Sequence, residues 1–593
     1  MALGVPSRSG DNRRGGSGHL GVPSRSGDDR RGGSPGVFPP AGRGRAVRVP
    51  GWTVVGVLVA LAVAGPLIAL PASFIVSADA FGQIAASLLP SALANSVLLA
   101  MGVGAGTLVL GGGLAVLVSF YDFPGRRWLD WALVLPMAMP AYVLVFVLLG
   151  QYGSANPLQT SLLGGGLALP DPRGPGGAMV VLSAVLYPYV YVLGRSAFLG
   201  QSRHAMEAAR SLGRTYGQAV RGVALPLARP ALAGGAALAV MEALADFGAV
   251  SLLGFETLTS AIYRVWYGAF DQAAALQLAT VLVSLALIMV ALERLLRGRA
   301  RYHQALARGD AVAPLRLRGA RRWLAPVAPC LLLTAIFAVP VAQLVAWSVE
   351  TLSQGTSGSD LAGAALNTLL LALGAAAIVV ATSTVVAYGQ RARPSRAGRV
   401  SARMAAVGYA VPGTVIAVAV YVPLVWFDRR LGDAAQSLLG VDLGLVVTGT
   451  ILGLVLAYVV RFHALAYFAV EARMGRISPS LDDAARALGA DRARVLADVH
   501  VPLLWPGVLT AALLVVVEVM KELPATALLR PLGGDTLAVT VWEATKDSRF
   551  DVAALPALAI VAVSLIPVVL FIRLSRRDGW SVAGAQGSTP SGG

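Results

Sequence analysis

The sequence predicts an all-α polytopic membrane protein of about twelve transmembrane helices, arranged in two parallel-related halves of six. Of the 593 residues, 56% are hydrophobic and only 13% are charged, about half the charged fraction of an ordinary soluble domain. The apolar residues come in long runs, and two regions of the chain repeat each other. One soluble core cannot bury so much apolar sequence, so we expect a membrane fold.

Twelve apolar runs are long enough to be the expected spans. A hydrocarbon core about 30 Å thick needs about 20 apolar residues per helix. In the first half the runs lie near 52–76, 92–120, 129–150, 177–199, 231–253 and 274–293. In the second half they lie near 323–348, 366–389, 403–427, 444–468, 507–529 and 552–573.

These spans divide the chain into five parts. The N-terminal tail carries the sequence LGVPSRSGD twice, from Leu3 and from Leu20. It has too few apolar residues to offset chain entropy, so we expect it to be disordered. The expected parts are the Arg/Gly/Ser-rich cytoplasmic tail (1–48), the first half (49–293), a basic cytoplasmic linker (294–322), the second half (323–577) and a C-terminal cytoplasmic tail (578–593).

Arginine supplies nearly all of the basic charge behind the net value of +17, since Lys521 and Lys546 are the only lysines. The arginines gather in alternate loops, such as Arg195–Arg229 and Arg473–Arg494. This is the pattern of cytoplasmic loops in membrane proteins. It argues against nucleic-acid binding and predicts that both termini lie in the cytoplasm, which an even number of spans also requires.

Residues for catalysis or metal binding are scarce. Cys330 is the only cysteine, which excludes disulfides and cysteine-based metal sites within one chain. The five histidines lack ligand spacing. No glycine-rich phosphate loop ending in Gly-Lys occurs, so the chain is not expected to hydrolyse ATP. We therefore expect no catalytic residue and no bound cofactor, and we assign no metal site.

The two halves match most closely in one short stretch. The first copy reads EAARSLG over 207–213, followed by Leu225-Pro226, and the second reads DAARALG over 483–489, followed by Val501-Pro502. Since both copies also share their loop charges, the halves should run parallel about an axis along the membrane normal. Further matched pairs are Asn95 with Asn367, Ser96 with Thr368, Pro140 with Pro412, Glu242 with Glu518 and Asp246 with Glu522.

Each matched stretch predicts a short helix, a turn and a second helix between two spans. Ala208 and Ala209 favour a helix and are small enough for another surface to approach closely. Gly213 can end that helix with a positive φ. Pro226 suits the first turn of the next membrane helix.

This pattern resembles the EAA loop of ABC-type importer permeases. In that family the loop forms a coupling helix that docks into a groove on the ATP-hydrolysing subunit. The second copy departs from the pattern by Asp for Glu and by Val501 for Leu. The resemblance assigns Glu207, Ala208, Ala209, Gly213 and Pro226 to the first coupling loop, and Asp483, Ala484, Ala485, Gly489 and Pro502 to the second.

The resemblance implies a transport subunit, not an enzyme, in the bacterial inner membrane. Its implied partners are a pair of ATP-binding cassette ATPase subunits, which hold the ATP and Mg, and an extracytoplasmic substrate-binding protein. Membrane lipid surrounds it, and no nucleic acid is expected.

Acidic residues occur inside two of the expected spans. Glu242 and Asp246 are four residues apart in the middle of one expected helix, so we expect them to share a face. Glu518 and Glu522 repeat this spacing in the second half, with Lys521 between. Each charge costs about 2.5–3.5 kcal/mol at the bilayer centre on insertion scales. Two interpretations remain open: the acids line the translocation path, where they suit a hard cation such as Fe³⁺, or they are structural and paired.

The neighbourhood of these acids resembles the iron(III) importer permeases, through MEALADFG over 241–248 and KELPAT over 521–526. The resemblance covers about residues 50–577 and implies uptake of ferric ion. Related two-half permeases carry thiamine or phosphonate, so those cargoes remain alternatives. An ion-coupled secondary transporter, which also uses repeats and buried acids, is the alternative from another class.

Overall fold

The computed structural model describes residues 51–76, 82, 87–151, 171–201, 203–297, 314–354, 359–392, 396–405, 408, 411–442, 444–491 and 494–583. The expected N-terminal tail and most of the expected C-terminal tail and linker lie outside these residues. The described part is helical apart from one parallel pair of two-residue strands, β1 (Tyr121–Asp122) and β2 (Leu315–Arg316). The expected all-α class is therefore confirmed.

The helices follow the two halves of the sequence. The first half holds α1 (Gly51–Val76), α3 (Leu89–Thr107), η1 (Leu108–Gly112), α4 (Gly113–Phe120), α5 (Arg126–Ala132), η2 (Leu135–Ala138), α6 (Ala141–Gln151), α8 (Pro175–Leu199), α9 (Arg203–Ser211), α10 (Tyr216–Ala219), η3 (Val220–Ala224), α11 (Leu225–Ala245), α12 (Gly248–Leu252), α13 (Leu258–Gly268) and α14 (Gln272–Arg297). The second holds α15 (Ala320–Leu324), α16 (Val327–Leu333), η4 (Thr334–Ala338), α17 (Val339–Ser353), α18 (Ser359–Ala392), α19 (Arg396–Ala405), α20 (Gly413–Leu439), α21 (Ile451–Met474), α22 (Pro479–Ala487), η6 (Val495–His500), α24 (Val501–Met520), α25 (Pro524–Leu529), α26 (Leu537–Lys546) and α27 (Phe550–Ala583).

Ten helical stretches among the described residues are long and apolar enough to cross a membrane, and a bent pair raises the number to eleven. The expected count of twelve is therefore approximate. The two expected spans that differ are 129–150 and 403–427, the third of each half. The first is the bent pair, Arg126–Ala138 with Ala141–Gln151, which meet at 87°.

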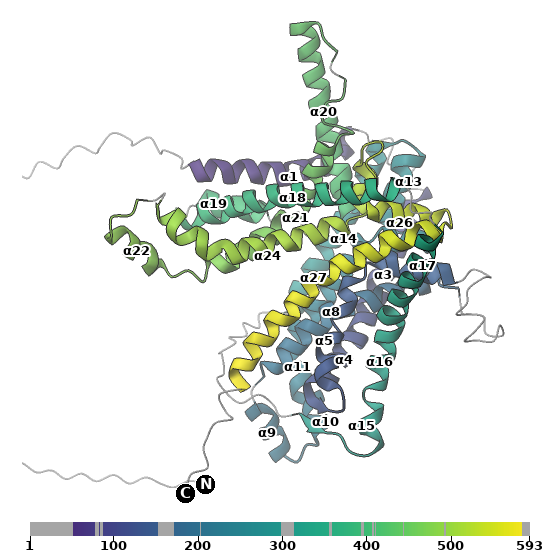
Figure 1. Ribbon diagram of the computed structural model, residues 1–593, viewed down its shortest axis with the longest axis vertical. Helices are drawn as coiled ribbons and strands as arrows, with labels where there is room; N and C mark the ends of the chain where they lie inside the picture. The colour runs from purple at the N-terminus through teal and green to yellow at the C-terminus, as the bar shows by residue number, and fades with distance from the viewer. Residues whose placement is uncertain are drawn as a thin grey trace, which may run out of the picture. The chain divides into compact units, whose positions relative to one another are not determined.

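Prolines explain both departures. The residue before a proline is pushed out of the α region, and Met139, just before Pro140, has an extended backbone. The matched Pro412 is likewise non-helical, so α20 begins only after it. The α20 helix then continues past its apolar part through Asp428 to Leu439, and Figure 1 shows it projecting beyond the neighbouring helices.

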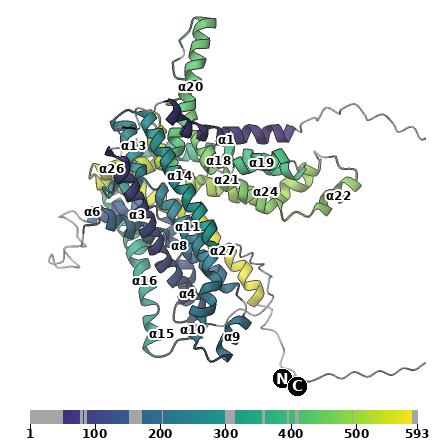
Figure 2. The ribbon, with the colours of Figure 1, turned by 180° about the vertical axis from the view of Figure 1, so that it is seen from behind.

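The two halves of the sequence exchange helices. The α1 helix of the first half packs against α18, α19 and α20 of the second, and it lies along α18 in both views (Figures 1 and 2). The α17 helix of the second half packs in turn against α6 and α27. One hydrophobic core therefore joins most of α3–α12 to α16–α17 and α26–α27, and the other joins most of α18–α25 to α1, α13 and α14.

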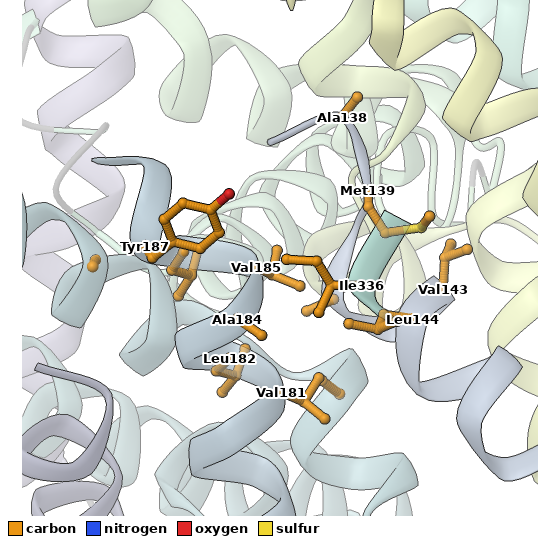
Figure 3. Packing of buried hydrophobic residues seen from close by; sticks show 14 of the residues in the cluster. Ala138, Met139, Val143, Leu144, Val181, Leu182, Ala184, Val185, Tyr187 and Ile336 are labelled. Atoms are coloured by element: carbon orange, nitrogen blue, oxygen red, sulfur yellow. The ribbon is translucent and has the colours of Figure 1, made fainter. Parts of the chain in front are cut away.

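Figure 3 shows this exchange at close range. Ile336, from the start of the second half, lies beside Leu144 of α6 and Val185 of α8. On α8, the buried Tyr187 hydroxyl donates a hydrogen bond of 2.8 Å to the carbonyl of Leu133. Apolar packing and buried hydrogen bonds thus hold the broken third span and the exchanged helix against α8.

The internal duplication extends to individual hydrogen bonds. Asn95 donates to the second carbonyl before α13 at 2.8 Å, and the matched Asn367 donates to the second carbonyl before α26 at 3.2 Å. The next residues, Ser96 and Thr368, each accept the first amide of those helices at 2.9 Å. The residue matches found in the sequence therefore mark equivalent contacts.

The exchange of helices predicts that neither half folds alone. Residues 1–305 and 306–593, expressed as separate chains, should assemble and purify together when both are present. Either fragment alone should be degraded or aggregate, because each core lacks the helices that the other fragment contributes. Co-purification and limited proteolysis measure this, and a monodisperse, protease-resistant single fragment would contradict it.

Candidate functional site

The two matched loops fold in the same way. In the first, α9 ends and Gly213 adopts a φ of 83°. Its amide donates to the carbonyl of Arg210 at 3.0 Å, and the next amide donates to that of Ala209 at 3.2 Å. This pair of bonds is the Schellman arrangement, which needs a left-handed residue at the turn.

The second loop repeats this turn. After α22, Gly489 also has a φ of 83°. Its amide donates to the carbonyl of Arg486 at 3.0 Å, and the amide of Ala490 donates to that of Ala485 at 3.0 Å. The predicted helix and turn are therefore present in both copies, and the glycines occur where the backbone requires them.

The chain then enters a membrane helix through one π-helical turn in each copy. Thr215 caps α10 in the first copy, and the matched Asp491 accepts the amide of Arg494 at 2.8 Å in the second. The turns η3 and η6 follow, and each ends two residues before a proline, Pro226 in the first copy and Pro502 in the second. Proline has no amide hydrogen to donate, so it is tolerated in the first turn of a helix. In each copy the π turn leads into the membrane helix, and the proline falls in the first turn of α11 or α24.

One face of each loop is exposed. Glu207 and Ala208 are exposed while Ala209 is buried, and in the second loop Asp483 and Ala484 are exposed while Ala485 is half-buried. Leu212 and Leu488, which precede the turn glycines, are 83% and 89% exposed. These leucines were not among the predicted site residues, although they recur at the same place in both copies. Each loop therefore carries an acid, an alanine and a leucine on its exposed face.

The four acids inside the expected spans lie near one another, at the C-terminal ends of α11 and α24. One cavity is lined by Glu242, Asp246, Glu518 and Glu522, together with Lys521 and Arg461. A second, adjoining cavity shares Glu242, Glu518 and Arg461 and includes Pro412. The residues matched by the duplication therefore face one space between the halves.

The expectation that the acids of each pair lie on one continuous helix is wrong. The α11 helix ends at Ala245 and α24 ends at Met520, so Asp246 and Glu522 follow the helix ends. Asp246 accepts the amide of Ala249 at 2.8 Å. Such a carboxylate caps the N-terminus of the next short helix, α12, and explains why the chain turns there.

The carboxylate of Glu522 has more partners than that of Asp246. Its carboxylate accepts the amides of Ala525 and Thr526, each at 3.0 Å, which caps α25. Arg461 of α21 donates to it at 3.3 Å, and the Glu522 side chain is 1% exposed. A β-carbon at Gly413 would lie 1.9 Å from Arg461, so glycine is required for this close approach. The structural interpretation therefore holds for Glu522.

The remaining two acids differ from each other. Glu518 pairs with Lys521 at 2.7 Å. Glu242 makes no hydrogen bond or ion pair with any described residue, and it lines both cavities. The described residues contain no group of three or more His, Cys, Asp or Glu side chains arranged to hold a metal ion. Glu242 is thus the acid whose carboxyl group lines the cavity without a hydrogen-bond or ion-pair partner among the described residues.

Sequence reasoning missed two cavity residues. Arg461 is a single arginine inside an apolar run, and that isolation was visible in the sequence. Tyr142, just after the break at Pro140, lines the cavity and donates to the carbonyl of Lys521 at 3.5 Å. No local pattern distinguishes Tyr142 from a packing aromatic, so only the fold identifies it.

Replacing the turn glycine should loosen the second loop. An L-residue in the left-handed region costs about 1–2 kcal/mol, so Gly489→Ala should raise amide hydrogen exchange in α22 by about 5–30-fold. Gly475→Ala is the matched control, because Gly475 has a negative φ and only ordinary contacts for a β-carbon. Equal exchange in the two variants would contradict the requirement for glycine.

Removing Arg461 should destabilise the protein, because it leaves the buried Glu522 carboxylate without its cation. Breaking a buried pair in this way costs about 3–5 kcal/mol. Arg461→Met should therefore lower the midpoint of thermal unfolding in detergent. The double variant Arg461→Met/Glu522→Gln should recover most of that loss, and a double variant no more stable than the single one would count against the pairing.

Comparison with known proteins agrees with this architecture. Residues 107–302 and 377–577 each match the family described as binding-protein-dependent transport system inner membrane component. The Fe(3+)-transport system permease protein FbpB 2 of Haemophilus influenzae is 26% identical over 482 residues, which cover 81% of this chain and 88% of that protein.

Other relatives are named for different cargoes. The molybdate/tungstate transport system permease protein WtpB of Thermococcus kodakarensis is 25% identical over 35% of this chain and 78% of its own length. PhnV of Salmonella typhimurium, named for 2-aminoethylphosphonate transport, is 30% identical over 23% of this chain and 51% of its own length. With two matched domains that cover most of a duplicated, multi-pass chain, this protein belongs to the family of inner-membrane permease components of binding-protein-dependent transport systems.

Proposed function

We propose that this chain is the translocation subunit of an ATP-driven importer of ferric iron. In this proposal both termini and both matched loops lie in the cytoplasm, as the arginine-rich loops indicate. Each loop docks on one of a pair of separate ATPase subunits, which bind ATP and Mg. A binding protein delivers the ferric ion from the other side.

The continuity between loop and cavity supports the coupling part of the proposal. The α11 helix starts next to the first loop and ends at the residue before Asp246. The α24 helix starts next to the second loop and ends two residues before Glu522. With 21 and 20 residues, each helix is about 30 Å long. A displacement of either loop is therefore carried along one helix to the cavity.

The charge of the cavity supports a cationic cargo. Of the cavity's four carboxyl groups, those of Glu518 and Glu522 are paired with Lys521 and Arg461, which leaves the two of Glu242 and Asp246 in excess. Carboxylate oxygens are the ligands that hard cations prefer. The similarity to an Fe(3+) permease spans most of both chains, which favours ferric ion among such cations.

An oxyanion such as molybdate is the second candidate, because Lys521 and Arg461 line the same cavity. The ion pairs of Lys521 with Glu518 and of Arg461 with Glu522 argue against it. Both cations are already neutralised, so neither is free to attract an anion.

The test is ATPase activity of the chain assembled with its ATPase subunit in lipid nanodiscs. Binding proteins loaded with ferric ion, molybdate, 2-aminoethylphosphonate or thiamine are added in turn. Stimulation by the ferric-loaded protein is expected. Stimulation by an oxyanion-loaded protein would overturn the iron assignment, and ion-gradient-driven uptake without ATP would overturn the coupling.

Neutralising Glu242 should slow iron transport. Glu242→Gln removes the one cavity carboxylate without a partner among the described residues. Ferric uptake into proteoliposomes should fall by about tenfold, equivalent to about 1.4 kcal/mol of lost attraction. Glu350→Gln, on an exposed part of α17 that does not line the cavity, is the control. Equal uptake by both variants would exclude Glu242 from the path.

A further inference from the structure

The second loop is attached to the membrane helices by a buried charged network. Asp482, on α22, lies next to the residue that the repeat assigns to docking. Its carboxylate accepts from Arg391 at the end of α18, at 3.2 and 3.3 Å. Nε2 of His500, in η6, lies 2.7 Å from the other carboxylate oxygen. The three side chains are 16%, 14% and 3% exposed for Arg391, Asp482 and His500 respectively.

Arg391 extends the network to a fourth element. Its guanidinium also donates to the carbonyls of Met474 at 3.0 Å and Ile477 at 2.9 Å, at the end of α21. The side chain therefore fixes the point where α21 ends and α22 begins. A planar guanidinium with five donors can bind a carboxylate and several carbonyls at once, which lysine cannot do.

The charge state of Asp482 fits this arrangement. Burial acts to raise its pKa, but the hydrogen bond from His500 and the charge of Arg391 outweigh burial and hold the pKa below its usual range. The carboxylate is thus ionised at neutral pH and accepts from both partners. The other ring nitrogen of His500, Nδ1, is buried without a hydrogen-bond partner among the described residues, so His500 is held through Nε2.

Among the side chains that the structure describes, the first loop shows no matching charged network at these positions. At the positions matched to Arg391, Asp482 and His500 the first half has Ser119, Met206 and Ala224. All of these are buried, and Met206 and Ala224 belong to the hydrophobic core. Hydrophobic packing holds these positions. Two neutral hydrogen bonds add to it: the Tyr216 hydroxyl donates to the carbonyl of Phe120 at 3.0 Å, and the Gln201 side chain donates to the carbonyl of Ala224 at 2.9 Å. The duplicated loops are thus alike in backbone and different in attachment.

We propose that Arg391, Asp482 and His500 form a clamp that makes the second loop a rigid lever on α18 and α21, so that the two coupling loops transmit motion unequally. Packed apolar side chains can slide and repack, whereas a buried ion pair with directional hydrogen bonds holds one geometry. Movement of α22 by the ATPase therefore displaces α18 and α21 together with α24. These residues are positioning residues, and the inference rests on the docking role proposed above.

The test is the amount of substrate transported per ATP hydrolysed by the full chain assembled with its ATPase subunit. Asp482→Asn and Arg391→Gln should each lower this ratio by about tenfold, while basal ATP hydrolysis continues. Asp482→Glu should restore part of the ratio, since it keeps the carboxylate. Arg494→Gln is the matched control, because it removes an exposed ion pair with Asp498 from the same loop.

A second variant separates loss of the network from loss of the fold. Arg391→Ser/Asp482→Met/His500→Ala gives the second half the residues of the first half at all three matched positions, so no buried arginine is left without its carboxylate. It should assemble with the ATPase yet show the lowered ratio. An assembled Asp482→Asn or triple variant with the wild-type ratio would overturn the clamp. Absence of ATPase assembly with the wild-type chain would instead overturn the proposed docking.

Discussion

Charged groups in an apolar interior must be paired or hydrogen-bonded, and this constraint organises the region between the two halves. Glu522 is held by Arg461 and by two backbone amides. Asp246 is held by amides of the next helix, and Glu518 by Lys521. Satisfying Asp246 and Glu522 ends α11 and α24 at the cavity. The short helices α12 and α25 then begin there, so the acids determine the backbone as well as the charge of the site.

The same two helices connect the acids to the loops at their other ends. Each begins with a π turn and a proline after a loop whose glycine has the same φ of 83° in both copies. The first helix of each half packs against helices of the other half, so a displacement that starts in one half moves helices of the other. The cavity can therefore respond to both loops, and the second is attached through the buried charges of Arg391 and Asp482.

Much of this arrangement could be predicted from residues that recur at matched positions. Asn95 and Asn367 proved to make equivalent hydrogen bonds, and Gly213 and Gly489 equivalent turns. Local pattern could not predict where an apolar run stops being a helix. The runs around Glu242 and Glu518 read as continuous spans, but both helices end where the carboxylates of Asp246 and Glu522 accept amides of the next short helix. Nor could it predict the partner of Glu522, because Arg461 is distant in sequence and reaches it through space left by Gly413.

The most direct test of the account is ATP-dependent uptake of labelled ferric ion into proteoliposomes that contain this chain, its ATPase subunit and a ferric-loaded binding protein. The account predicts uptake that requires ATP hydrolysis and continues when ion gradients are collapsed, because the energy enters through the two loops. Uptake that persists without ATP and stops when the gradients collapse would contradict it.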